Sequence, residues 1–119
     1  MPENYITVPG EKGSVYIAED VIAVIVGTAI SEVEGVAGLT HAEGPGFGEI
    51  LGFKSLSRGV HVGTEGNKII IDAAIYVHGG ASIASIGEHA QKAAAGAVES
   101  MTGMDSVVNI HIAGVSFDK

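Results

Sequence analysis

The segment from Lys68 to His78, which reads KIIIDAAIYVH, decides the fold of this protein. Side chains alternate between the two faces of a β-strand, so the segment predicts one strand with two unlike faces. The face expected to lie in the core is wholly aliphatic and carries Ile69, Ile71, Ala73, Ile75 and Val77. The opposite face carries Ile70, Asp72, Ala74, Tyr76 and His78.

The segments beside this strand predict a hairpin and a helix. Residues 60–62 read Val-His-Val and lead into Gly-Thr-Glu-Gly-Asn at 63–67, a turn-like sequence that joins two antiparallel strands. After the glycine pair at 79–80, Ser82 or Ser85 can cap a helix whose apolar stripe ends near Gly103, the expected stop signal. A last strand is expected from 107 to about 115. Its inward-facing residues are expected to be Val108, Ile110 and Ile112.

The N-terminal third adds another strand and another helix. Residues 1–13 are expected to be a flexible arm, followed by a short strand at 14–17. Apolar residues recur at helical spacing between Asp20 and Val33, and Gly35 can end that helix. A single domain is therefore expected over residues 14–117, with a long glycine-rich loop at about 38–59.

These elements follow one another in the order β-α-β-β-α-β. The sheet has one aliphatic face, and both helices carry apolar stripes. We therefore expect an α+β fold, a two-layer sandwich with both helices on one face of a mostly antiparallel sheet. This element order is that of ferredoxin-like folds, but the sequence leaves the strand order open.

Composition excludes several classes of function. The chain has 119 residues, no cysteine and a formal net charge of −8. A strongly acidic surface repels nucleic acid and anionic lipid, so neither nucleic acid nor direct membrane insertion is expected. Without cysteine there are no disulfides and no thiolate metal sites, which fits a cytoplasmic location.

The expected contact surface is the face of the sheet that the helices leave open. Ile70, Ala74 and Tyr76 lie there, where a solvated strand would carry Lys, Glu or Thr. Phe47 and Phe53, in the glycine-rich loop, are further candidates for an interface. Alternatively, the N-terminal arm or the loop folds back and covers this face.

Candidate ligand sites are weak. Residues 44–49 read GPGFGE, but a phosphate-binding glycine loop follows a strand and opens a helix, whereas this one follows a helix. His61, His78 and His111 fall on the open face by alternation, with Asp72 and Asn109 beside them. Without a close-spaced histidine motif, solvent or interface histidines are expected rather than a metal site.

No catalytic constellation is visible either. The candidate nucleophiles lack an elbow-type context, and the carboxylates are spread singly along the chain. The expectation is therefore a protein without enzymatic activity, catalytic residues, cofactor or metal.

Several segments resemble the alkaline shock protein family of Gram-positive bacteria. They are GSVYI at 13–17, EVEGVAG at 32–38, LGFKSLSRGV at 51–60, the strand around Ile71-Asp72, and the tail from Met101 to Phe117. Together they cover roughly residues 13–117, in the order of the family.

The resemblance implies a general-stress or envelope-homeostasis protein with no established catalytic site. Some relatives associate with themselves and lie beneath the membrane by binding a small membrane-anchored protein. A homo-oligomeric scaffold or adaptor is therefore expected, cytoplasmic and associated with the membrane through a partner. The alternative is a regulator of lipid or phosphate metabolism that binds a small ligand through its glycine-rich loop.

Overall fold

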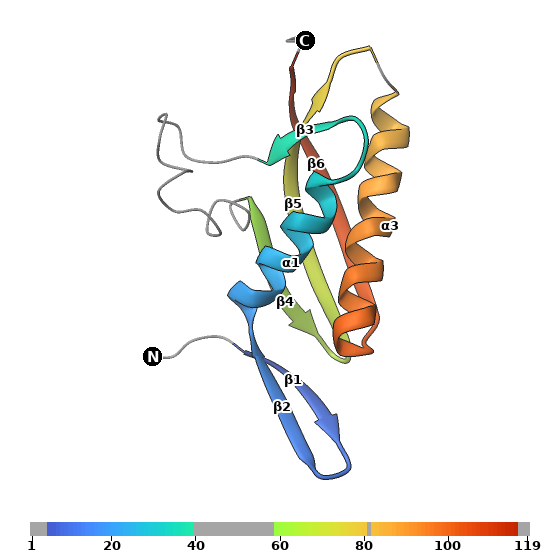
Figure 1. Ribbon diagram of the computed structural model, residues 1–119. Coiled ribbons are helices and arrows are strands. Elements are labelled where there is room, and N and C mark those ends of the chain that lie inside the picture. Colours follow the sequence, from blue (N-terminus) through green and yellow to red (C-terminus); the bar gives the residue numbers. More distant parts are fainter. Residues whose placement is uncertain (1–4, 40–58, 81, 117–119) are drawn as a thin grey trace.

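The computed structural model describes residues 5–39, 59–80 and 82–116 (Figure 1). In chain order the elements are β1 (Tyr5–Gly10), β2 (Gly13–Ala18), α1 (Glu19–Ser31), β3 (Val36–Leu39), β4 (Val60–Glu65), β5 (Lys68–His78), α3 (Ile83–Thr102) and β6 (Ser106–Ser116). The predicted order β-α-β-β-α-β is present, with β1 and β3 as additional strands.

Strand β5 is the centre of the main sheet. Strand β6 runs parallel to it along residues 69–78, while β4 and β3 run antiparallel to residues 68–73 and 75–77. Because β6 occupies one edge of β5 throughout, β4 and β3 must follow one another along the other edge. The sheet is mostly antiparallel, as predicted. The parallel pair is possible because α3 carries the chain back between β5 and β6.

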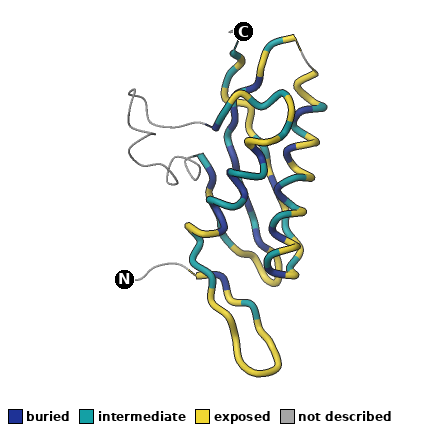
Figure 2. The backbone as a smooth tube through the Cα atoms, in the orientation of Figure 1, coloured by how far each residue is buried: buried dark blue, intermediate teal, exposed yellow. Residues whose placement is uncertain are grey.

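Both helices pack on the same face of this sheet, as predicted. The predicted core residues of β5 have essentially no exposed surface, and they pack against Ile22, Val26 and Ile30 of α1 and Ala90, Ala94 and Val98 of α3. Figure 2 shows the buried residues concentrated between the sheet and the helices. The small alanines of α3 let that helix approach closely, and burial of each large aliphatic residue contributes roughly 1.5–3 kcal/mol.

The ends of α3 agree with its sequence signals. The Ser82 side chain accepts a hydrogen bond from the Ser85 N–H at 3.3 Å, which identifies Ser82 as the N-cap. Gly103 adopts a left-handed conformation, with φ of 75°, and its N–H donates to the Glu99 carbonyl. Helix α1 lacks a side-chain cap but begins with Glu19 and Asp20, whose charges favour a helix N-terminus.

The outer edge of β6 lies beside α3. The Ile69 N–H donates to the Asp105 carbonyl, so by alternation the backbone groups of Val108 point away from β5. The side chain of Gln91, on α3, donates to the Val108 carbonyl at 3.1 Å. This contact satisfies one acceptor of a strand edge that would otherwise attract another chain.

The N-terminal region differs from the expectation. Residues 5–10 form strand β1 rather than part of a flexible arm, because they pair with β2 in a regular antiparallel ladder. This hairpin makes its own two-stranded sheet and extends beyond the end of the main sheet (Figure 1). Ile6 at its base is buried in the main core and anchors it.

The last strand also departs from strict alternation. Val108 is buried and Ile110 is half-buried, as predicted. Ile112 pairs with the core residue Ile75, on the predicted face, but is 36% exposed. The register between β5 and β6 slips by one residue just beyond Ile112, where Tyr76 is paired with Gly114. This β-bulge moves the residues after it to the other face of the strand.

Candidate functional site

The candidate functional site is the open face of the main sheet, which lies on the side opposite α1 and α3. Strands β3, β4, β5 and β6 contribute to it, and their register places the side chains in rows. The first row is Gly63, Ile70 and Val107; the second is His61, Asp72 and Asn109; Ala74 and His111 come next. Tyr76 lies in the last row, between Gly38 of β3 and Gly114 of β6.

The apolar side chains of the open face are only partly exposed. Val107 is exposed by 39%, whereas Ile70, Ala74 and Tyr76 are only half-buried because neighbouring side chains shield part of their surface. The row that contains Asp72 separates the apolar pair Ile70 and Val107 from Tyr76. The surface therefore consists of two apolar parts with a polar band between them.

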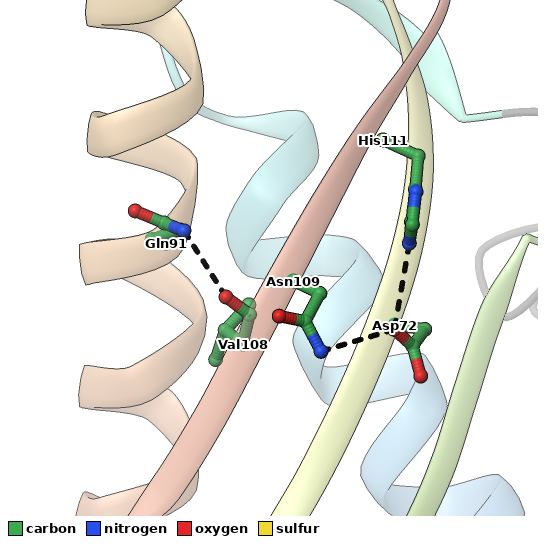
Figure 3. Close-up of polar contacts among 5 residues, drawn as sticks. All are labelled: Asp72, Gln91, Val108, Asn109 and His111. Atoms are coloured by element: carbon green, nitrogen blue, oxygen red, sulfur yellow. Dashed lines mark hydrogen bonds and ion pairs between the residues drawn. The ribbon is translucent and has the colours of Figure 1, made fainter.

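Asp72 is the centre of that polar band (Figure 3). Its Oδ1 accepts a hydrogen bond from the Asn109 Nδ2 at 3.1 Å and lies 3.4 Å from the His111 Nε2. The Asp72–His111 contact becomes an ion pair only when the imidazole is protonated. Both side chains are about half exposed or more, so water weakens the attraction between them. The band fixes polar side chains in place but holds no buried charge.

The three histidines do not form a common site. His61 is the cross-strand neighbour of Asp72, His111 contacts Asp72 from the other side, and His78 is exposed at the end of β5. Within residues 5–39, 59–80 and 82–116, no group of three or more His, Asp or Glu side chains is arranged to hold a metal ion. The absence of a bound metal stays a prediction.

The ring of Tyr76 occupies the space that a side chain at Gly114 would fill. A β-carbon at Gly114 would lie 2.9 Å from two ring carbons of Tyr76, so the ring lies directly over the β6 backbone. Any side chain at position 114 would displace the ring. Gly114 is therefore required for the shape of this part of the open face.

The other candidate interface residues belong to the expected glycine-rich loop. Phe47, Phe53 and the glycine-rich motif at 44–49 lie outside the residues that the structure describes. The expectations for the loop, both the apolar contact and the ligand site, remain predictions. Gly38, at the expected start of that loop, belongs to strand β3.

A second exposed apolar surface, which the sequence patterns did not predict, lies on the hairpin of β1 and β2. Tyr16, Val15 and Tyr5 are exposed by 64%, 61% and 54%. A signal is present in the sequence, because residues 14–17 have the pattern of a strand. Without a predicted partner strand, however, its exposure could not be inferred.

Comparisons with known proteins point to one family. The family model for alkaline shock protein 23, described as having a cell envelope-related function, matches residues 7–117. No helix among the described residues is long and apolar enough to cross a membrane.

Similar proteins occur in two Gram-positive organisms. The chain is 36% identical to the uncharacterized protein YqhY of Bacillus subtilis (strain 168), an alignment that covers 89% of this chain and 79% of that protein. It is 35% identical to YloU of the same organism, over 87% and 88% of the two chains. It is 30% identical to Spy1535 of Streptococcus pyogenes serotype M6, over 90% and 82%.

Among solved structures, the nickel form of a MamM CTD variant superposes with a TM-score of 0.47. The two chains are 13% identical, and the alignment covers 83% of this chain and 98% of the other. A likeness this distant carries no information about function.

Proposed function

The chain belongs to the alkaline shock protein 23 family, whose function is related to the cell envelope, and from this premise we propose that it is a non-enzymatic scaffold or adaptor. It associates with itself and binds partner proteins near the membrane. The observation that carries the proposal is the open face of the main sheet, where Ile70 and Val107 adjoin without a covering layer among the described residues.

The uncovered face of the sheet and its few carboxylates support this proposal. Two-layer folds bury only the sheet face beneath the helices, so the second face meets water or another molecule. A solvated face normally carries many charged side chains. Apart from Glu65 at the hairpin turn, the described strands contribute one carboxylate here, Asp72, and Asn109 and His111 are already engaged with it. A contact surface with apolar parts and a fixed polar band suits a specific protein partner.

Replacement of Ile70 by glutamate is expected to weaken self-association by at least about tenfold in Kd, because an unpaired carboxylate would lose its water at the interface. The fold should persist, since Ile70 points away from the helices. Sedimentation velocity over a concentration series measures the association, and circular dichroism reports the fold.

Val21→Glu is the matched control. Val21 is an exposed aliphatic residue on α1, away from the open face, and its replacement adds the same charge. It should leave association unchanged. Equal weakening by both variants would mean that net charge is responsible, and an unchanged oligomer in Ile70→Glu would contradict a contact through the open face.

Association with the membrane is proposed to require a partner protein. With a net charge of −8, the isolated chain should stay in the supernatant when vesicles of phosphatidylcholine and phosphatidylserine are sedimented. The same test with vesicles of phosphatidylcholine alone separates charge repulsion from simple lack of affinity. Cosedimentation with either vesicle, without any other protein, would contradict an indirect membrane association.

A further inference from the structure

The hairpin of β1 and β2 carries the three most exposed large apolar residues of the described chain, Tyr5, Val15 and Tyr16. Its register separates the side chains into two faces. The tyrosine face consists of Tyr5, Thr7, Pro9, Ser14, Tyr16 and Ala18. The valine face consists of Ile6, Val8, Val15 and Ile17.

These two faces differ in how they relate to the rest of the molecule. On the valine face, Ile6 is buried and Ile17 packs against the core, so the base of this face is already covered by the rest of the molecule. On the tyrosine face, Tyr5 lies opposite Ala18, and Thr7 lies opposite Tyr16. The two tyrosines are thus diagonal neighbours on adjacent strands and form one aromatic surface across both.

A two-stranded ribbon with such a surface is incomplete by itself. An isolated hairpin is marginally stable in water, and it gains stability when a further layer covers one of its faces. The described part of the chain covers only the base of the valine face. A second molecule packed on the tyrosine face would supply such a layer.

The charge distribution favours a second copy of the chain as that molecule. Residues 5–18 contain one acid and one base, Glu11 and Lys12, both at the turn, so the whole net charge of −8 resides elsewhere in the chain. A basic partner would be attracted to the acidic surfaces rather than to this neutral hairpin. A second copy of the chain, by contrast, is repelled by most of the surface and can approach closely at the hairpin.

We propose that the tyrosine faces of two hairpins pack against each other about a two-fold axis and join two copies of this chain. This inference rests on the self-association in the proposed function and adds a contact distinct from the open face. The same patch serves both copies, which is the requirement for a closed symmetric dimer. The tyrosine rings are buried at the contact, and their hydroxyls stay at its wet rim.

The expected strength follows from the area. Four partly exposed tyrosines that each lose on the order of 100 Å² give, with the small residues between them, an interface below about 1,000 Å². Contacts of this size are weak and reversible. The hairpin contact by itself should therefore give a dimer whose population rises with concentration.

The test compares Tyr16→Ser with Val15→Ser. The two residues are adjacent in β2 and nearly equally exposed, and they lie on opposite faces of the hairpin. Both substitutions lower strand propensity, so any loosening of the hairpin affects the two variants alike. In sedimentation velocity over a concentration series, Tyr16→Ser should raise the dimer Kd by at least about tenfold, whereas Val15→Ser should not change it.

A cross-linking measurement keeps both tyrosines in place. The chain has no cysteine, so Thr7→Cys introduces a single thiol near the middle of the tyrosine face. Packed sheets lie about 10 Å apart, which matches a bismaleimide of similar span but is too far for a disulfide. Thr7→Cys should form cross-linked dimers efficiently, and Val15→Cys on the valine face should form few.

The outcomes are distinguishable. Full association of Tyr16→Ser, equal weakening by Val15→Ser, or efficient cross-linking only through Val15→Cys overturns the inference. If Ile70→Glu abolishes association while Tyr16→Ser preserves it, the proposed function stands without the hairpin contact. A wild-type chain that is monomeric at every concentration overturns both.

Discussion

Replacement of Ile71 by alanine is expected to lower the free energy of unfolding by about 2–5 kcal/mol. Ile71 has no exposed surface and lies on the central strand, with β4 on one side and β6 on the other. Removal of its side chain loses transfer free energy and leaves a cavity that the surrounding sheet cannot close. Urea denaturation followed by far-UV circular dichroism measures the change.

The neighbouring residue provides the control for this prediction. Ile70→Ala removes the same atoms from a half-buried position on the open face and should cost less than about 1.5 kcal/mol. Both variants should be measured at one low protein concentration, because association stabilises the folded state by mass action. Equal losses for Ile70 and Ile71 would contradict the assignment of the two faces of β5.

Replacement of Gly35 by alanine is expected to lower the free energy of unfolding by about 2–4 kcal/mol. Two costs combine. Gly35 has φ of 99°, a conformation that L-residues rarely adopt, and a β-carbon there would lie 2.7 Å from Cδ1 and Cγ1 of Ile86. The side chain of Ile86 cannot withdraw easily, because it is buried in the core beneath α3.

Gly96→Ala is the matched control, and the sign of its effect should be opposite. Gly96 lies inside α3 and is exposed, and a β-carbon added there would meet no neighbouring side chain within 4 Å. Alanine there should stabilise by about 0.5–1 kcal/mol, because it restricts the unfolded chain and favours the helix. Thermal denaturation of both variants checks the pair.

A double-mutant cycle separates the two costs at Gly35. In the background of Ile86→Ala the steric overlap disappears and only the backbone strain remains. Gly35→Ala should then cost less than it does in the wild-type chain, and the difference is the coupling free energy between positions 35 and 86. A cycle without coupling would show that the close approach of Gly35 to α3 contributes nothing to stability.

Elements that depend on local pattern could be predicted from the sequence. The alternation in β5 was confirmed at every core position, since a strand of period two with one aliphatic face has only one orientation that buries that face. The sequence offered Ser82 or Ser85 as the N-cap of α3 and Gly103 as its C-cap, and the structure uses Ser82 and Gly103. Such ends can be predicted because caps act within one helical turn. The two-layer packing could be predicted because the sheet has one aliphatic face and both helices carry an apolar stripe.

Other elements depend on distant partners and were missed. Strand β1 contains Pro9 and Gly10, both disfavoured in strands, and exists through its pairing with β2. Strand β3 has only four residues and pairs with the far end of β5. The bulge after Ile112 arises in the ladder with β5, and alternation along β6 alone cannot reveal it.

The features of the candidate site also fall into two groups, those fixed within one strand and those that depend on neighbouring strands. The sequence by itself determined that Ile70, Ala74 and Tyr76 face away from the core, because that property is fixed by alternation within one strand. Only the tertiary structure decided that Asp72 joins Asn109 and His111, that Tyr76 lies over Gly114, and that the hairpin tyrosines stay exposed. Each of these depends on which strands are neighbours and in which register, and such long-range pairing is selected by the packing of the whole chain.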